Sequence, residues 1–238
     1  KMITKSAYNE NAFTKNMVFT KSARDAWKLI LNTVKSKKGF ANILLPSYIG
    51  VTDREGSGIF DPVEVTESQY SFYKLKEDLS VDYDQLQLLA QTGVYNVLLV
   101  VHYFGFCRND LNRIKQICDT HEILFVEDCA HAFHLGAEKE GLGITGDFSF
   151  YSVHKYLAVP TGGILKNISG KMELLNLPEE YKMNIDVALQ LLNSDNISIA
   201  QKRKNNFNLY REKLEGTEGV IIMYKLADNE IPQTFPIL

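Results

Sequence analysis

Residues whose types can do chemistry stand where the sequence pattern ends a strand or begins a helix. Asp128 and His131 follow the apolar residues of VEDCAHAF, and Ser152 and Lys155 follow the aromatic run FSFY. Ser22 precedes an amphipathic stretch, where the free backbone N–H groups of a helix start would favour an anion. In open α/β sheets, ligands bind beyond the carboxyl ends of the parallel strands. The pattern therefore predicts one crevice that holds a lysine, a carboxylate and an anion-binding helix end.

This combination of groups meets the needs of pyridoxal 5'-phosphate. That cofactor requires a lysine that holds it as a Schiff base, a carboxylate that keeps its ring nitrogen protonated, and donors for its phosphate. Taken singly, each residue also has a purely structural interpretation. Lys155 could be a surface lysine, Asp128 a turn cap, Ser22 a plain helix N-cap, and His131 a hydrogen-bonded structural histidine. The combination, in this order and spacing, favours the cofactor.

The elements that must position these residues follow from hydrophobic periodicity. A strand over 94–105, a helix over 108–121 and a strand over 122–131 form a βαβ unit, which predicts a parallel sheet. Further helices are predicted over 22–36, 82–92, 172–193 and 198–214. Further strands are predicted over 42–46, 58–66, 148–153, 162–167, 219–225 and 232–238, and Pro62 makes the strand over 58–66 an edge or irregular one.

Length, composition and charge exclude several classes. The chain has 238 residues, which suggests one large domain with at most a fragment of another. Lys and Arg total 26 and Asp and Glu total 29, so the net charge of −3 argues against a general nucleic-acid binder. The apolar runs are far shorter than the ~20 residues needed to span a bilayer. Three cysteines without a regular spacing are no disulfide framework and fit a reducing compartment, so we expect a cytoplasmic protein. From the charge and the short apolar runs, we expect it to bind neither nucleic acid nor membrane.

A metal site is the main alternative that the residues themselves raise. Asp128, Cys129, His131 and His134 are all possible ligands. Their spacing, however, matches no established zinc pattern. A hydrolase has less support, because the sequence contains neither a G-x-S-x-G elbow nor a phosphate-binding G-x-x-x-x-G-K-[ST] loop.

The same residues resemble the DegT/DnrJ/StrS family of fold-type-I sugar aminotransferases, which depend on pyridoxal phosphate. VHYFG, VEDCAHAF and GDFSFYSVHKYLAVPTGGIL resemble, in order and interval, the family's VHxxG strand end, its EDxAHA strand end, its GD…S…K segment and its GG strand. SARDAW and ILLPSY resemble the phosphate loop and the PSxT segment more weakly. The resemblance covers most of residues 18–214. It implies an α/β fold, a three-layer α/β/α sandwich with a mostly parallel sheet.

The resemblance also implies roles for residues of the cofactor pocket. Lys155 would form the Schiff base and then move the proton between substrate and cofactor, and Asp128 would pair with the ring nitrogen. His131 would hydrogen-bond the ring oxygen. Ser152 would hold the phosphate, with Ser149 as the alternative.

The remaining implied contacts lie near the helix start and on a neighbouring subunit. The backbone amides of Ala23 and Arg24, with Ser22, would complete the phosphate site. Many family members have an aromatic residue that stacks on the cofactor where this chain has Gly50, and Tyr48 or an aromatic of the YFG segment would substitute for it. Family members are homodimers with shared sites, so Lys182 or Asn184 would reach the partner's phosphate. Asn184 could equally be a polar helix start.

These expectations combine into one function with two alternatives. Residues 1–215 would form the cofactor-binding large domain and residues 216–238 the start of an incomplete small domain. The chain would move an amino group from an amino acid, expected to be glutamate, to a keto-sugar that is usually nucleotide-linked in this family. The alternatives are a catalytically silent relative that acts as a binding or regulatory protein, and a metal-dependent enzyme at Asp128, Cys129, His131 and His134.

Overall fold

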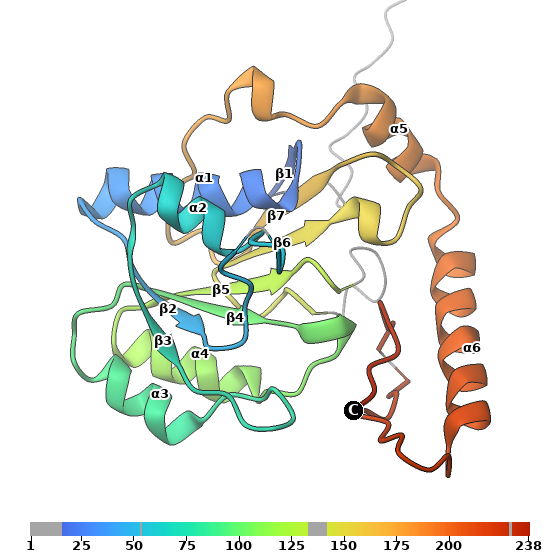
Figure 1. Cartoon of the computed structure of the whole chain (residues 1–238). Coiled ribbons are helices and arrows are strands. Elements are labelled where there is room, and N and C mark those ends of the chain that lie inside the picture. The colour runs from blue at the N-terminus through green and yellow to red at the C-terminus, as the bar shows by residue number, and fades with distance from the viewer. Residues whose placement is uncertain (1–15, 53, 133–141, 229) are drawn as a thin grey trace, which may run out of the picture.

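The computed structural model describes residues 16–52, 54–132, 142–228 and 230–238, and within them seven strands form one sheet in the order β1-β7-β6-β5-β4-β2-β3 (Figure 1). The strands are β1 (Met17–Thr20), β2 (Asn42–Pro46), β3 (Gln69–Tyr73), β4 (Val97–Val101), β5 (Leu124–Cys129), β6 (Phe148–Ser152) and β7 (Gly163–Asn167). The helices are α1 (Ala23–Lys38), α2 (Phe60–Val65), α3 (Tyr83–Ala90), α4 (Leu111–Thr120), α5 (Ile185–Asn193) and α6 (Asn196–Leu214).

Strand direction brings the ends of distant segments to one edge of the sheet. β3, β2, β4, β5 and β6 are parallel neighbours, whereas β7 runs antiparallel to both β6 and β1. The carboxyl ends of every strand except β7 therefore lie at one edge, which we call the carboxyl edge, and β7 begins there. This is the edge at which α/β proteins bind their ligands.

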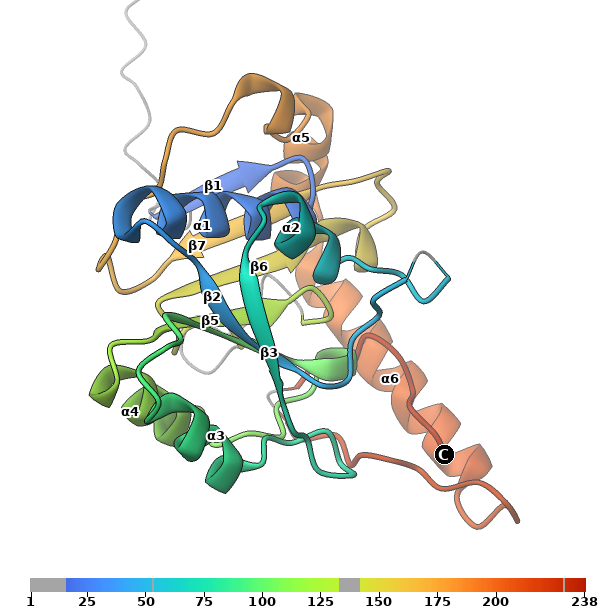
Figure 2. The same ribbon diagram turned by 60° about the vertical axis from the view of Figure 1, so that its left-hand side comes forward.

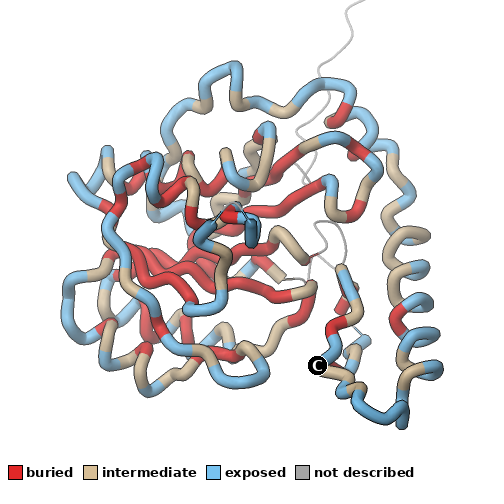
Figure 3. The backbone as a smooth tube through the Cα atoms, viewed as in Figure 1, coloured by how far each residue is buried: buried red, intermediate tan, exposed pale blue. Residues whose placement is uncertain are grey.

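Helices cover both faces of the sheet, which confirms the predicted three-layer α/β fold. Alternate residues of the buried strands point to opposite faces. Val97 and Leu99 of β4 join a core cluster with α1 and α2, whereas Leu98 and Val100 join a second cluster with α3 and α4. Figure 2 shows these two helix pairs on either side of the sheet, and Figure 3 shows the buried residues concentrated in the strands between them.

Three helices begin at side-chain caps that the sequence already displays. Ser22, Asp82 and Asp110 each accept the backbone N–H of the residue three positions later, at 3.2, 3.1 and 3.0 Å. Such a cap supplies a partner for one of the N–H groups that a helix start leaves unpaired. Helix α1 ends at Gly39, whose φ of 82° is the left-handed conformation that glycine adopts without strain.

The predicted strand over 58–66 is wrong, because this segment contains helix α2. Pro62 lies in the first turn of the helix, where its missing N–H would have had no intrahelical partner. Phe60 and Val63 are buried against α1, and the indole N–H of Trp27 donates to the carbonyl of Ile59 at 3.1 Å. Packing against α1 therefore decides the conformation of a segment whose strand pattern was weak.

Three other sequence predictions also need correction. Of the helix expected over 172–193, only α5 forms. The two strands expected after 218 reduce to one antiparallel bridge between Ile222 and Ile237. Strands β1 and β3 were not predicted at all, because as outer strands they carry too few buried side chains to show a strand pattern.

Helix α6 stands beside the sheet, with the carboxyl-terminal segment between them (Figure 1). Its one buried residue, Phe207, packs on Phe106 at a ring distance of 5.6 Å and on Phe235 at 4.7 Å. Tyr224 joins the same cluster. The helix is therefore attached to the rest of the molecule mainly through aromatic residues of the tail and through a small number of polar contacts.

Candidate active site

Lys155, His131 and Asp128 come together at the carboxyl edge. Asp128 is near the end of β5, and Lys155 ends the one-turn helix that follows the neighbouring strand β6. The ammonium nitrogen of Lys155 lies 3.4 Å from Nε2 of His131. The positive charge of Lys155 also acts on the pKa of Asp128. The structure therefore brings these three residues together at the carboxyl edge, and their shared role stays a prediction.

Burial at this site shifts the pKa of both Asp128 and His131. Burial raises the pKa of Asp128 to about 6, although the N–H of Ala130, the charge of His102 and the charge of Lys155 all oppose that rise. The pKa of His131 falls to about 4, because burial and then Lys155 disfavour its charged form. At neutral pH the pocket therefore holds a buried carboxylate beside a neutral imidazole.

Asp128 is expected to cost the apoprotein stability, so Asp128→Asn should make it more stable. The asparagine Oδ1 can still accept the N–H of Ala130, which Asp128 binds at 2.8 Å. Because the folded pKa of about 6 exceeds the unfolded value of ~3.9, we expect a gain of about 1–3 kcal/mol at pH 7. The gain should shrink as the pH falls from 6 toward 4, because the carboxyl of the folded wild-type protein then takes up a proton and no longer buries a charge.

Urea unfolding of the apoprotein at pH 7 and at pH 4 measures this difference. Asp228→Asn, at an exposed position, is the matched control and should change neither value. Equal or lower stability of Asp128→Asn at pH 7 would show that the pocket does not strain the carboxylate.

The start of helix α1 lies next to the turn that carries Lys155. In the sheet, Thr20 pairs with Gly163, and Gly163 pairs with Ser152. A Cβ on Gly163 would stand 2.3 Å from the carbonyl carbon of Ser22, so only glycine permits this approach. The hydroxyl of Thr161 donates to the carbonyl of Lys21. The helix end and the lysine turn thus form adjoining walls of one cradle.

This cradle offers the donors that a phosphate needs. The first amides of α1, on Ala23 and Arg24, precede any intrahelical acceptor and point out of the helix start. Ser152 is buried, faces the same side of the sheet as Phe150, and has its hydroxyl 3.2 Å from Nδ1 of His154. Helix N-termini with such hydroxyls are ready anion sites.

The hydroxyl of Ser22 is committed within its own helix start, because it donates to Oδ2 of Asp25 at 2.6 Å, so Ser22 offers no free donor to a phosphate here.

Two other neighbouring groups are also committed. The side chain of Arg24 forms an ion pair with Asp61 at 3.3 Å, which leaves only its backbone for the predicted role. Ser149, the alternative phosphate ligand, donates its hydroxyl to the carbonyl of Gly143 at 2.8 Å and is fully buried. Because residues 149 and 152 of a strand face opposite sides, the geometry favours Ser152.

An aromatic row lines the carboxyl edge where the family pattern has its stacking residue. Tyr48 is 57% exposed, and its ring lies 5.6 Å from that of Tyr103. The ring of Phe104 stacks on His131 at 6.3 Å and an interplanar angle of 15°. At Gly50 itself, a Cβ would meet the carbonyl oxygen of Gly56 at 2.5 Å. No side chain fits there without a shift of the backbone, which explains the glycine.

Asn184 has a structural role within this chain. It is the N-cap of α5 and accepts the N–H of Asp186 at 2.8 Å. Lys182 is exposed and pairs with Glu179 at 2.6 Å. The interpretation of this segment as a polar helix start is therefore met, and the role toward a partner subunit stays a prediction.

The alternative metal cluster is not supported by those of its members that the structure describes. Asp128 and Cys129 are consecutive in β5 and point to opposite faces of the sheet. The buried Cys129 thiol instead lies with His102 and Glu127. Both carboxylate oxygens of Glu127 are occupied there by protein donors. His134 lies outside the described residues.

Sequence reasoning missed a buried ion pair on the other face of β5. His102 Nε2 lies 2.7 Å from Glu127 Oε2, and both side chains are completely buried. The same carboxylate accepts the N–H groups of Gly143, Thr145 and Gly146, so it holds the segment that leads into β6. The His of VHYFG and the Glu of VEDCAHAF were visible in the sequence, but they lie 25 residues apart and nothing in that spacing marked them as partners.

Comparison with known proteins agrees with this geometry. Residues 78–173 match the DegT/DnrJ/EryC1/StrS aminotransferase family. The predicted family resemblance is thereby confirmed, and the matched stretch contains Asp128, His131, Ser152 and Lys155. No curated protein matches the chain by sequence.

Solved structures of sugar aminotransferases share the fold. CalS13 from Micromonospora echinospora has a TM-score of 0.68 and 20% identity, over 93% of this chain and 68% of its own. Helicobacter pylori PseC, an aminotransferase involved in the biosynthesis of pseudoaminic acid, has a TM-score of 0.73 and 16% identity, over 95% and 67%. Spr1654 from Streptococcus pneumoniae, in its PMP-form, has a TM-score of 0.70 and 15% identity, over 93% and 66%.

The chain thus spans about two thirds of the length of these aminotransferases. At such identities the likeness establishes the fold alone, and the family match covers residues 78–173. Among the described helices, none is long and apolar enough to cross a membrane.

Proposed function

We propose that this chain is the cofactor-binding part of a pyridoxal-phosphate-dependent aminotransferase. The observation that carries the proposal is the meeting of Lys155, His131 and Asp128 at the carboxyl edge, beside the open start of α1. The residues fit the cofactor, because the free amides of Ala23 and Arg24 start a helix beside the turn that carries Lys155, and Asp128 is a buried carboxylate close to that lysine. The PMP-form of the similar Spr1654 supports the same choice.

When bound, this cofactor supplies an electron sink that stabilises negative charge on the substrate carbon. Lys155 would hold its aldehyde carbon covalently and, once displaced by a substrate amine, would carry the proton to and from that carbon. Asp128 would keep the ring nitrogen protonated, and that positive charge would in turn remove the cost of burying the carboxylate. Ser152 and the amides of Ala23 and Arg24 would hold the phosphate.

His131 would act as the neutral partner of the ring oxygen. Its lowered pKa keeps it uncharged at neutral pH, so it offers one N–H without competing with the positive ring nitrogen for Asp128. Phe104, Tyr103 and Tyr48 would close the cofactor's open face in place of the aromatic residue that Gly50 excludes.

We further propose that glutamate donates the amino group and that a keto-sugar, in nucleotide-linked form, accepts it. The match to a family of sugar aminotransferases supports a sugar acceptor. We also propose a cytoplasmic homodimer in which residues 1–215 form the large domain and residues 216–238 begin a second one. Three free thiols, on Cys107, Cys118 and Cys129, support the reducing compartment.

Titration of the purified protein with pyridoxal phosphate tests the function. We expect a yellow protein whose visible band bleaches when glutamate is added, because the amino group moves to the cofactor and the 2-oxo acid leaves. The control is 2-oxoglutarate, which has no amino group and should leave the band unchanged.

The two failures of this experiment have different meanings. A well-folded protein whose spectrum does not change with saturating cofactor would refute the proposal. A yellow protein that ignores glutamate and other amino acids would instead indicate the silent relative, which the crowded position of Gly50 keeps open as a second candidate.

A further inference from the structure

A guanidinium group from outside the crevice contacts the backbone of Lys155. Arg203, on α6, donates to the carbonyl oxygen of Lys155 at 2.8 Å and to that of Gln233 at 2.9 Å. The same guanidinium lies 4.4 Å above the ring of Tyr156. A planar fork that bonds two carbonyls and stacks on an aromatic ring is an arrangement that arginine makes and lysine does not.

The turn that carries Lys155 needs an external partner at this point. Lys155 is the last residue of a one-turn 3₁₀ helix, and the last carbonyls of a helix have no intrahelical donor. Arg203 supplies that donor from an element 48 residues further along the chain. Its bond therefore restrains the backbone from which the lysine side chain extends.

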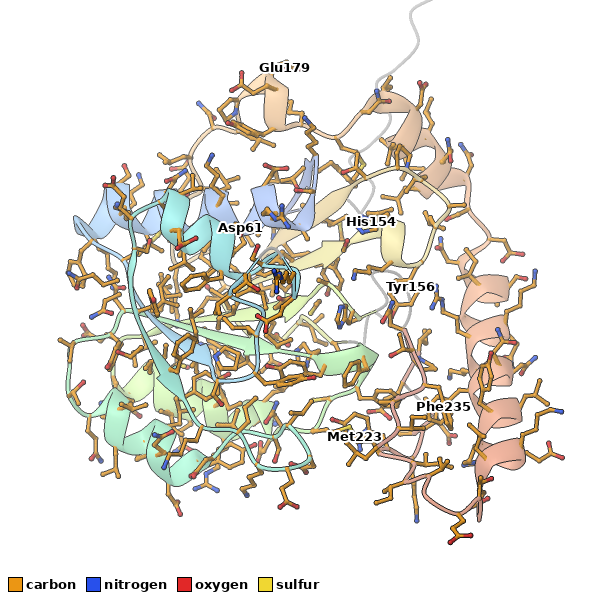
Figure 4. All side chains as sticks on the ribbon, viewed as in Figure 1. Asp61, His154, Tyr156, Glu179, Met223 and Phe235 are labelled. Atoms are coloured by element: carbon orange, nitrogen blue, oxygen red, sulfur yellow. The ribbon has the colours of Figure 1, made fainter. Side chains whose placement is uncertain are left out.

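Tyr156, whose ring lies under Arg203, restrains His131. The hydroxyl of Tyr156 donates to the carbonyl of His131 at 2.5 Å, with the carbonyl of Ile231 at 3.4 Å. Gly105 is packed tightly at the same point, since a Cβ on it would stand 2.7 Å from the His131 carbonyl and 2.8 Å from that of Ile231. Figure 4 shows Tyr156 next to the tail segment that carries Phe235.

We propose that Arg203 is a positioning residue for Lys155 and His131, and that it couples their geometry to α6 and to the tail segment 231–233. This inference rests on the proposed function, in which Lys155 holds the cofactor. Arg203 does not touch the reacting atoms. It acts through the carbonyl of Lys155 and through the ring of Tyr156, so its loss should misplace the amine while leaving the fold intact.

The test compares Arg203→Lys and Arg203→Met with Lys204→Met. The side chain of Lys204, the next residue of the helix, bonds the carbonyl of Asp228 in the same tail, so this control breaks a helix-to-tail contact without touching Lys155. We expect both Arg203 variants to weaken pyridoxal phosphate binding by about tenfold and to shift the pH midpoint of the bound cofactor's visible band, because a hydrogen bond to a charged group is lost. Lys204→Met should leave both at the wild-type values.

A second readout does not require the cofactor. Reductive methylation of the apoprotein with formaldehyde and cyanoborohydride, followed by peptide mass mapping, gives the labelling rate of each lysine amine against pH. We expect the rate profile of Lys155 to change in both Arg203 variants but not in Lys204→Met, while exposed Lys213 stays the same in all three.

The outcomes separate the two proposals. If wild-type protein binds no cofactor, the proposed function fails, and the labelling profile still tests the positioning role. If the Arg203 variants melt like the wild type and retain its labelling profile at Lys155, the positioning role is refuted. Equal effects of Arg203→Lys and Lys204→Met would also refute it, because they would show that docking of the tail is all that matters.

Discussion

Lys155→Ala is expected to lower the rate of amino transfer by at least about a thousandfold, because the residue that binds the cofactor and moves the proton is gone. In wild-type protein, borohydride should fix the cofactor on the peptide that contains Lys155. In Lys155→Ala it should fix none there. Lys155→Arg keeps the positive charge beside His131 and Asp128 but cannot make the covalent bond, so it should be equally inactive.

Two controls separate the loss of Lys155 from a general loss of activity or of cofactor binding. Lys213→Ala changes an exposed lysine of α6 and should retain full activity and full fixation. The phosphate cradle at Ser22 does not involve the lysine, so Lys155→Ala should still bind the cofactor, with a spectrum close to that of free cofactor. Fixation on another lysine in the wild type, or activity above a tenth of wild type in Lys155→Ala, would contradict the assignment.

Glu127→Ala is expected to reduce the free energy of unfolding by about 3–5 kcal/mol, because it leaves His102 buried without its partner. It also removes the acceptor of the N–H groups of Gly143, Thr145 and Gly146. Glu127→Gln should be nearly as harmful, since its amide group would face donors at one of the two oxygen positions. Urea unfolding of the apoprotein measures the loss, and Glu64→Gln, at an exposed position of α2, is the control.

The same pair should show a characteristic dependence on pH. Burial alone would raise the pKa of Glu127, but the hydrogen bond and charge of His102 lower it below its usual value. Its contribution is therefore complete above about pH 4.3 and is lost as the pH falls through the lower folded pKa. Burial would lower the pKa of His102, but Cys129, Cys107 and Glu127 raise it, so its contribution is complete below about pH 6.5 and is lost as the pH rises through the folded pKa.

The loss of unfolding free energy in Glu127→Gln should therefore be largest between about pH 4.3 and about pH 6.5, where both groups contribute fully. A variant within 1 kcal/mol of the wild type at pH 5.5 would show that the pair does not hold the sheet edge together.

The parts of the fold that were predictable have local causes. Ser22, Asp110 and Gly39 cap helices through contacts within one turn, and β4 is buried on both faces, so its apolar run is unbroken. The wrong or missing elements depend on distant packing. α2 forms because Phe60 meets α1, and β1 forms because it pairs with β7.

The site shows the same division. Asp128 and Lys155 were predictable because strand ends and residue order bring them to one edge. The His102–Glu127 pair was not, because charged residues are rarely fully buried and their pairing joins two strands. Nor was Arg203, whose contact with Lys155 spans two elements with no shared sequence pattern.

One consequence follows from the reversed direction of β7. The chain leaves the sheet at Ser152 and returns at Gly163, which is the partner of Ser152 in the strand ladder. Residues 153–162 therefore form a loop whose two ends are held together by one residue pair, Ser152 and Gly163. A loop closed in this way samples few conformations. Most of the conformational entropy of the backbone that carries Lys155 is therefore lost when the protein folds. It need not be lost again when a ligand binds.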